Sequence, residues 1–422
     1  MSAIIELSIA PSVNSHSQMR AAQKKWALTS IRDRSHVVRK LRHLIAKKLE
    51  LLAEAAAAVN RRPIAEKLVS EVLPLADACR WLERNAVRVL AARRHGKRGQ
   101  PLWLRGLSFE VQRQPFGCVL VIGPGNYPLF LPAVHTLHAL LAGNAVLLKP
   151  APGTRAVALA FAQLAFDSGL DSDLLTVLPE GIESAKDAIA AGVDKVVFTG
   201  SSENGRDLLA ALAESNTPAV MELSGEDAML VLADADLNLV ARAVRFGLRL
   251  NGGETCIAPQ RLIVMESVAD DLRRCLHEDI SIERVSSEEA AIACVNASEF
   301  GLGAAIFSRD ITKARDIAAR LKTGFVVIND LIVPTADPRM PFGGVKASGF
   351  GSTRGEEGLL EMTFPHVVTV RRGGTHPHFD EATADDADFF ASYIRAVHGR
   401  DRFGAWREFF VALRKKIRVT KS

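Results

Sequence analysis

The chain of 422 residues contains few aromatic residues and few cysteines, and each shortage excludes a class of protein. Phenylalanine, tryptophan and tyrosine make up 6% of the chain. It therefore lacks the aromatic platforms of a nucleic-acid-binding surface. The five cysteines are widely spaced and form no Cys-x-x-Cys pair. This pattern indicates neither a disulfide framework nor a thiolate zinc site, and it predicts a reducing compartment such as the cytoplasm.

Long apolar segments and a strong charge excess are also missing. No apolar run reaches the roughly 18 residues that a membrane-spanning helix requires. Residues 3–13 lack the basic start of a secretory signal. The net charge is +5, from 53 basic and 48 acidic residues. An excess this small predicts no nucleic acid partner.

What the sequence does contain is an alternation of helical patterns and short apolar runs. Residues 17–92 have helical periodicity, and residues 99–116 include an alternating, strand-like segment. Apolar runs then follow at 118–122, 145–148, 174–178, 195–198 and 219–221, with helical stretches between several of them. Strands of this kind predict a parallel sheet covered on both faces, and dinucleotides bind beyond the carboxyl ends of such strands.

A second α/β region is expected between residues 225 and 355. Its apolar runs lie at 229–232, 261–264, 304–307 and 325–328. A late strand is predicted at 367–370. The fold class is therefore α/β.

Four short segments carry side chains suited to catalysis or cofactor binding. Cys256 follows two glycines in a polar segment, and Glu222 ends an apolar run. Asn126 follows Gly123-Pro124-Gly125 in a turn, and Gly200 and Gly205 bound a short turn that leads into a helix. Taken singly, each has a plain alternative: a buried thiol, a surface glutamate, a loop or an ordinary turn.

Together these segments resemble the aldehyde dehydrogenase superfamily from about residue 17 to residue 372. The matching strings, in family order, are Pro115-Phe-Gly, Ile122-Gly-Pro-Gly-Asn126-Tyr-Pro, Ala142-Gly-Asn-Ala-Val, Leu148-Lys149-Pro150, Phe198-Thr-Gly-Ser, Glu222-Leu-Ser-Gly225, Gly253-Glu-Thr-Cys256, Phe300-Gly-Leu and Met340-Pro-Phe-Gly-Gly-Val-Lys346-Ala-Ser-Gly349.

The resemblance implies oxidation of an aldehyde to a carboxylic acid. Cys256 is implied to be the nucleophile, and Glu222 the base that activates water for thioester hydrolysis. The Asn126 amide and the Cys256 backbone N–H are implied to bind the oxyanion.

The implied cofactor is NAD or NADP. The resemblance places Lys149 at the adenosine ribose and Gly200 and Ser201 at the pyrophosphate. It also assigns Ile122, Pro124, Gly205 and Leu223 to the cofactor site, and it implies no metal.

The resemblance also implies a domain organisation. A Rossmann-like NAD(P)-binding domain is expected over 1–100 and 116–223, and a catalytic domain over 224–355. Residues 101–115 and 366–373 are expected to be oligomerisation strands, which predicts a homodimer or tetramer. Residues 375–422 are expected to form a helical extension whose apolar faces pack on the protein body or its dimer mate. Contact of this tail with a membrane surface is the less favoured alternative.

Three departures from the family pattern affect function. Gly125 replaces a common tryptophan, and no acid follows closely after Lys149. From Cys256 to Pro341 the chain is unusually short, and a Glu-x-Phe-Gly-Pro string that normally holds the nicotinamide ribose is missing. We therefore expect NAD binding with slow oxidation, or none, of simple aldehydes. Two alternatives stay open: a relative that transfers the acyl group to coenzyme A, and a non-catalytic binding or scaffolding protein.

Overall fold

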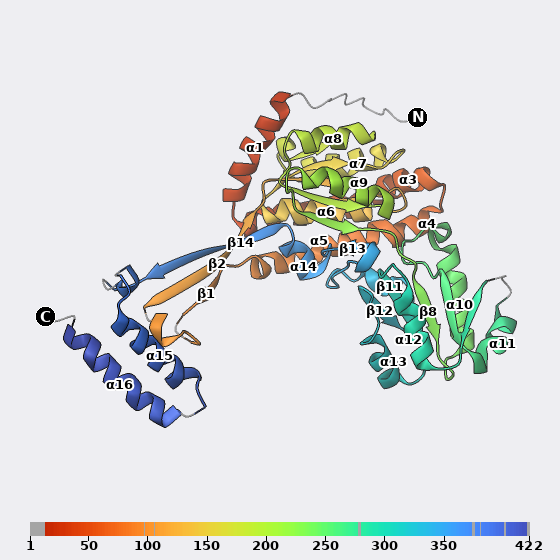
Figure 1. The fold of residues 1–422 in the computed structure, drawn as a ribbon. Coiled ribbons are helices and arrows are strands. Elements are labelled where there is room, and N and C mark those ends of the chain that lie inside the picture. The colour runs from red at the N-terminus through yellow and green to blue at the C-terminus, as the bar shows by residue number, and fades with distance from the viewer. Residues whose placement is uncertain are drawn as a thin grey trace. The chain divides into compact units, whose positions relative to one another are not determined.

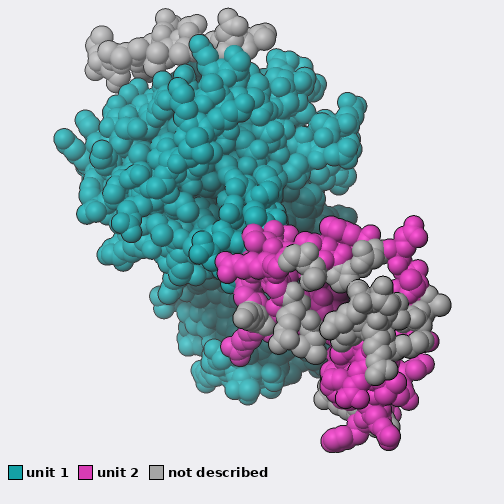
Figure 2. All heavy atoms as spheres, turned by 90° about the vertical axis from the view of Figure 1, so that its left-hand side faces the viewer, with its two compact units in different colours: residues 1–94, 110–368 teal, residues 95–109, 369–422 magenta. Residues whose placement is uncertain are grey.

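The structure, a computed structural model, describes residues 13–96, 98–104, 106–276, 280–373, 376–379, 381–400 and 402–419. The chain forms two compact units. One contains residues 1–94 and 110–368, and the other contains residues 95–109 and 369–422 (Figure 2). All candidate catalytic and cofactor residues lie in the larger unit.

The larger unit begins with helices, as the periodicity of the sequence predicts. They are α1 (Val13–Leu28), α2 (Ile31–Lys47), α3 (Leu49–Asn60), α4 (Ile64–Lys67), a π-helical turn (Leu68–Val72) and α5 (Leu73–Val89). Helix α2 shows why they form: Ser30 Oγ caps it by accepting the Asp33 N–H at 3.1 Å, and Val38, Leu41 and Ile45 make one buried face.

A six-stranded sheet follows, in the order β13-β7-β6-β3-β4-β5. Its strands are β3 (Cys118–Ile122), β4 (Ala145–Lys149), β5 (Leu175–Val177), β6 (Lys195–Thr199), β7 (Ala219–Glu222) and β13 (Gly349–Phe350), and the helices α6 (Phe130–Ala142), α7 (Arg155–Asp167), α8 (Ile182–Ala190) and α9 (Ser202–Ala213) connect them (Figure 1). All paired strands are parallel except β13, which is antiparallel to β7. Every residue of β3 and β4 is buried, which explains their continuous apolar runs. The predicted α/β class is confirmed.

The second sheet has five parallel strands in the order β10-β9-β8-β11-β12. These are β8 (Ala228–Val231), β9 (Arg261–Met265), β10 (Ile282–Val285), β11 (Gly303–Phe307) and β12 (Phe325–Ile328), accompanied by α10 (Leu237–Arg249), α11 (Glu266–Cys275), α12 (Glu288–Ala297) and α13 (Ile311–Ala318). Helix α14 (Gly355–Leu360) instead packs against α5 and α6. Strand β10 was not predicted, because two of its four residues are charged. Glu283 on β10 accepts a 2.8 Å hydrogen bond from Arg261 on β9.

A third, three-stranded sheet has the order β1-β2-β14. Its strands are β1 (Arg93–His95), β2 (Leu107–Pro115) and β14 (Thr363–Arg371). The alternating sequence of β2 correctly predicts a strand, but its exposure does not alternate, and Phe109 is exposed and stacks on His95.

Helices α15 (Ala384–His398) and α16 (Arg402–Val419) follow in the smaller unit. They pack against each other through aromatic rings, and the Phe389 and Phe409 centroids are 5.4 Å apart. In the part of the chain that the structure describes, no helix is both long and apolar enough to cross a bilayer.

Candidate active site

Cys256 lies just after a tight reversal of the backbone that follows α10. Asn251, Gly252 and Gly253 all have positive φ angles, of 49°, 68° and 78°. The φ of Gly252 lies in a region that L side chains rarely adopt, and a Cβ there would also displace the Arg62 guanidinium, so glycine is favoured at this position. This reversal brings Cys256 back toward the carboxyl end of β7.

Two cavities meet at Cys256. One, of about 450 Å³, has a rim rich in glycine and polar groups that includes Asn126, Gly200 and Glu222. The other, of about 340 Å³, is mostly apolar. Leu131, Thr255, Cys256 and Phe342 line both cavities. The thiol is therefore accessible from two directions, as a reaction between two separate ligands requires.

The surroundings of Cys256 favour the protonated thiol over the thiolate. Burial raises its pKa to about 12, and the negative charges of Glu222 and Asp227 act in the same direction. Arg354 opposes them and lowers the pKa. Because the thiolate is the reactive form, Cys256 needs an activating change before it attacks a substrate.

Glu222 ends β7 and is held by two threonine hydroxyls. Thr199 Oγ1 donates to Oε2 at 2.9 Å, and Thr353 Oγ1 donates to Oε1. Burial raises the pKa of Glu222, while Arg354 and the two hydroxyls act to lower it. A buried carboxyl with an elevated pKa is suited to exchange protons near neutral pH.

His135 on α6 also lies beside Glu222. Its Nε2 lies 3.8 Å from Glu222 Oε2, and neither ring nitrogen has a hydrogen-bond partner. Burial lowers the pKa of His135 to about 3, and Arg354 acts in the same direction. The imidazole is therefore neutral and does not compensate the charge of Glu222.

Asn126 lies on the rim of the polar cavity, beside the segment that carries Cys256. Its Nδ2 donates to the Glu254 carbonyl at 2.6 Å, and its Oδ1 accepts the Tyr127 N–H at 2.9 Å. An amide nitrogen carries two hydrogens, so one hydrogen remains for an oxyanion.

A buried network that the sequence did not reveal holds this segment in place. Lys67 Nζ donates to Glu71 Oε1 at 3.0 Å and to Asn251 Oδ1 at 3.1 Å. Asn251 Nδ2 donates in turn to the Asn126 carbonyl at 2.9 Å. Glu71 Oε2 accepts the N–H of Leu129 at 2.7 Å, just before α6 begins. The ion pair thus connects both loops at the reaction centre.

The structure brings together most of the predicted cofactor residues. Pro124, Gly200, Ser201 and Leu223 line the same cavity as Cys256, but Ile122, Lys149 and Gly205 do not. A Cβ at Gly205 would lie 2.5 Å from Leu223 Cδ2. Gly205 therefore allows α9 to pack closely on Leu223.

Ile122 and Lys149 are partners at the carboxyl ends of β3 and β4. Ser201 caps α9, a helix of 12 residues, by accepting the Asn204 N–H at 3.2 Å. A helix N-terminus suits a pyrophosphate, and a lysine beyond the strand ends suits a ribose hydroxyl. The donor groups therefore fit a dinucleotide.

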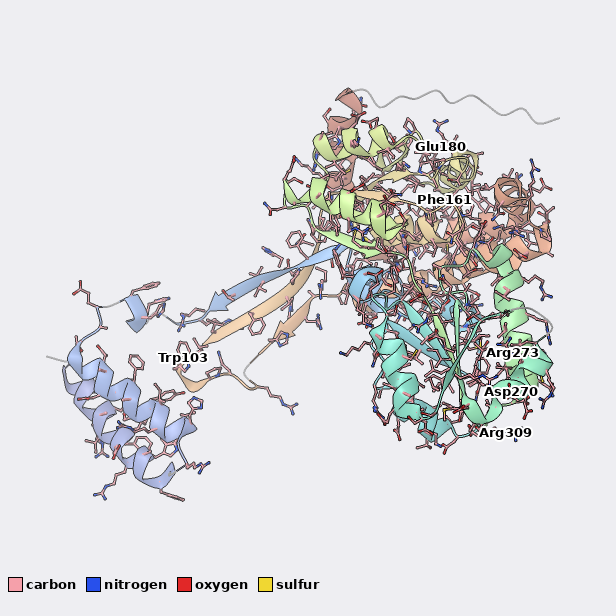
Figure 3. All side chains as sticks on the ribbon, turned by 45° about the vertical axis from the view of Figure 1, so that its right-hand side comes forward. Trp103, Phe161, Glu180, Asp270, Arg273 and Arg309 are labelled. Atoms are coloured by element: carbon pink, nitrogen blue, oxygen red, sulfur yellow. The ribbon has the colours of Figure 1, made fainter. Side chains whose placement is uncertain are left out.

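Lys149 has an acidic neighbour that the sequence alone does not reveal. No acid follows Lys149 closely in the sequence, but Glu180 is near enough to raise the Lys149 pKa, against the larger lowering caused by burial. Glu180 lies in the loop between β5 and α8 (Figure 3). Burial acts to raise its own pKa, but backbone N–H groups of residues 153–155 outweigh this and lower it. An ionised carboxylate therefore stands close to Lys149.

The fold agrees with comparisons to known proteins. The sequence model described as "Aldehyde dehydrogenase family" matches residues 13–282 and 280–368. The chain therefore belongs to the aldehyde dehydrogenase family, whose members are oxidoreductases that oxidise aldehydes with NAD or NADP. The two matched stretches meet at residues 280–282.

Individual relatives are distant. The chain is 28% identical to 4,4'-diapolycopene aldehyde oxidase of a Methylomonas species, over 90% of this chain and 86% of that protein. It is also 28% identical to the NADP/NAD-dependent aldehyde dehydrogenase PuuC of Escherichia coli, over 80% of this chain and 83% of that protein. The crystal structure of an aldehyde dehydrogenase from Burkholderia cenocepacia superposes with a TM-score of 0.80 at 24% identity, over 87% and 91% of the two chains. That last similarity shows the shared fold alone.

Proposed function

We propose that this protein oxidises an aldehyde to a carboxylic acid with NAD or NADP, through a thioester on Cys256 that Glu222 helps to hydrolyse. One observation carries the proposal: Cys256 lies where an apolar cavity meets a polar cavity that also contains Glu222. The apolar cavity would hold the aldehyde. The polar cavity would hold the nicotinamide end of the cofactor.

Each proposed step uses a group already described. The Cys256 thiolate adds to the carbonyl carbon, and the developing oxyanion is stabilised by Asn126 Nδ2 and the Cys256 backbone N–H. The cofactor supplies the hydride acceptor, and a thioester remains on Cys256. Glu222 then takes a proton from water as the water attacks the thioester, and the thiolate leaves with the electron pair of the broken C–S bond.

Water is the favoured acyl acceptor. Glu222 is held by Thr199 and Thr353 at the edge of the cavity that Cys256 lines. Transfer of the acyl group to coenzyme A would not require a base in that position, because no water has to be activated. A purely structural protein has no need to keep a buried carboxylate beside a thiol, since burial of that charge destabilises the fold.

The apolar cavity indicates the class of substrate. We propose an aldehyde with an apolar body, because the cavity wall is built mainly from aliphatic and aromatic side chains. These are Val69, Leu73, Pro74, Phe130, Leu131, Phe246, Leu250, Ile257, Ile332, Val333, Ala336 and Phe342.

The proposed assembly is a homodimer or tetramer in which residues 101–115 and 366–373 make contact. Strand β14 supports this, since Val367 and Val370 are 53% and 49% exposed. Within the chain, residues 1–100 and 116–223 are the proposed cofactor domain, and residues 224–355 the proposed catalytic domain.

The test is NADH formation with straight-chain aldehydes of increasing length, by the wild type and by Cys256→Ala. Longer chains should be preferred, and the variant should lose turnover yet bind NAD normally. Cys275→Ala is the matched control, because Cys275 lies on α11 and lines neither cavity. Full turnover by Cys256→Ala would contradict the proposal, and so would product formation only when coenzyme A is present.

A further inference from the structure

Arg354 is a buried cation at the reaction centre that the proposed chemistry has not yet used. It directly precedes α14 and is 5% exposed. Its guanidinium carbon lies 4.2 Å from the Phe342 ring centroid and 5.7 Å from that of Phe130. Phe342 lines both cavities, so the positive charge is held close to their junction.

The hydrogen bonds of Arg354 leave part of the guanidinium free. One Nη donates to the Thr335 carbonyl, whereas Nε is buried and has no partner. Burying an arginine without a paired carboxylate destabilises a fold. Such a residue needs a compensating role, and the neighbouring groups indicate what that role is.

No other cation lines either cavity among the residues that the structure describes. The charged groups that act on the pKa of Cys256 are Glu222 from β7, Asp227 from the segment before β8, and Arg354. Glu222 is influenced by Arg354 and contacts Thr199, Thr353 and the neutral His135. Among the described residues, Arg354 is therefore the one cation that lines a cavity at Cys256 and acts on both proposed catalytic residues.

We propose that Arg354 is a positioning residue whose charge balances a single negative charge that alternates between Cys256 and Glu222. Before attack, the thiol proton passes through cavity water to the Glu222 carboxylate, which leaves a thiolate and a neutral carboxylic acid. Once the thioester has formed, Cys256 carries no charge. Glu222 then releases its proton to water and becomes the anion that acts as base.

The summed charge of Cys256, Glu222 and Arg354 is therefore zero both before the attack and after the thioester has formed. Two anions beside one cation would leave an uncompensated buried charge, which is costly. The same balance explains how a thiol whose pKa is raised to about 12 becomes a nucleophile. The inference rests on the proposed roles of Cys256 and Glu222.

The test measures Cys256 alkylation by iodoacetamide against pH, which needs no turnover. Arg354→Met removes the charge, and Arg354→Lys keeps it. Alkylation of Arg354→Met at pH 8 should be slower by roughly tenfold or more, as a rise of about one unit in the thiol pKa gives. The alkylation rate of Arg354→Lys should stay within about threefold of the wild-type rate. Each of these proteins is also made with Cys256→Ala, and the alkylation of that matched variant is subtracted as the contribution of the other cysteines.

Two controls separate charge from packing. Arg339→Met also removes one arginine charge, but from an exposed side chain that lines neither cavity, and it should leave the profile unchanged. In Arg354→Ala, millimolar guanidinium ion should restore part of the alkylation rate. This second variant decides the matter if Arg354→Met does not fold.

The proposal is overturned if Arg354→Met alkylates like the wild type, if Arg354→Lys is slowed as much as Arg354→Met, or if guanidinium fails to rescue folded Arg354→Ala. If the proposed function is wrong but the role of Arg354 is right, the results differ from these. The alkylation profile then still depends on Arg354, but the wild type forms no NADH from any aldehyde.

Discussion

Thr199 and Glu222 lie opposite each other on β6 and β7, and Thr199 Oγ1 donates a 2.9 Å hydrogen bond to Glu222 Oε2. The bond joins the Phe-Thr-Gly-Ser turn of the polar cavity to the proposed base. A donor to the carboxylate favours its charged form, so the bond opposes the effect of burial on the Glu222 pKa.

Thr199→Val should therefore raise the pKa of Glu222. A hydrogen bond to a charged group contributes about 1.5–3 kcal/mol. At 1.36 kcal/mol per unit, the shift should be about 1–2 pH units. Since Glu222 must be ionised to act as base, the acidic limb of the kcat profile should move to higher pH. Thr199→Ser keeps the hydroxyl and should retain the wild-type limb. Identical acidic limbs in the wild type, Thr199→Val and Thr199→Ser would show that this hydrogen bond does not set the pKa of Glu222.

Glu180→Gln should increase the use of NADP relative to NAD. The Glu180 carboxylate acts on Lys149, the residue proposed to bind the adenosine ribose, and it would repel a 2′-phosphate. Removing about 1 kcal/mol of repulsion should change the ratio of kcat/KM values roughly fivefold. The wild type should still use both cofactors.

Glu183→Gln is the control for Glu180→Gln, because Glu183 is exposed on α8 and pairs with Lys186. Steady-state kinetics with both cofactors measures the effect. An unchanged ratio in Glu180→Gln would place the ribose away from Glu180.

Lys67→Met should destabilise the larger unit. It leaves the Glu71 carboxyl buried without its cation, and breaking a buried ion pair in this way costs about 3–5 kcal/mol. Lys186→Met breaks an exposed pair with Glu183 and should leave the unfolding midpoint nearly unchanged. Urea unfolding of both variants measures the difference. Equal unfolding midpoints would mean that the Lys67 pair contributes little.

The sequence was sufficient for the strands that contain a continuous apolar run, but not for side chains that meet across the fold. Strands β3, β4 and β6 are buried along their whole length, so a continuous apolar run reveals them. Strand β10 is stabilised partly by the ion pair between Arg261 and Glu283, which no local pattern shows.

The same limit applies to the candidate site. Cys256, Glu222 and Asn126 stand in recognisable strings, and the structure places all three around one cavity. Thr353 and Arg354 are more than 90 residues from Cys256 in the chain, and nothing in their own segment indicates contact with Glu222 or proximity to the thiol. Only the tertiary fold reveals them.

Hydride transfer should be slow compared with cofactor binding. The Glu-x-Phe-Gly-Pro string, which the family resemblance assigns to the nicotinamide ribose, is missing, while Lys149 and the N-terminus of α9 remain as the proposed contacts for the rest of the cofactor. Loss of one such hydrogen bond costs about 1.5–3 kcal/mol, and misplacing the ring by about an ångström costs a further ~100-fold in rate. Stopped-flow absorbance measures the rate of hydride transfer, and calorimetry measures the affinity for NAD. A rate near the typical enzyme value of ~10 per second would show that the missing string is not needed.

The central claim is that Cys256 and Glu222 act in sequence, and one measurement tests it most directly. Glu222→Gln is mixed with NAD and a long-chain aldehyde, and NADH is followed over time. The account predicts a burst of one NADH per functional Cys256, followed by a stall, because the thioester forms but is not hydrolysed. The double variant that also carries Cys256→Ala should show no burst. Continuous turnover by Glu222→Gln at the wild-type rate, without a burst, would contradict the account.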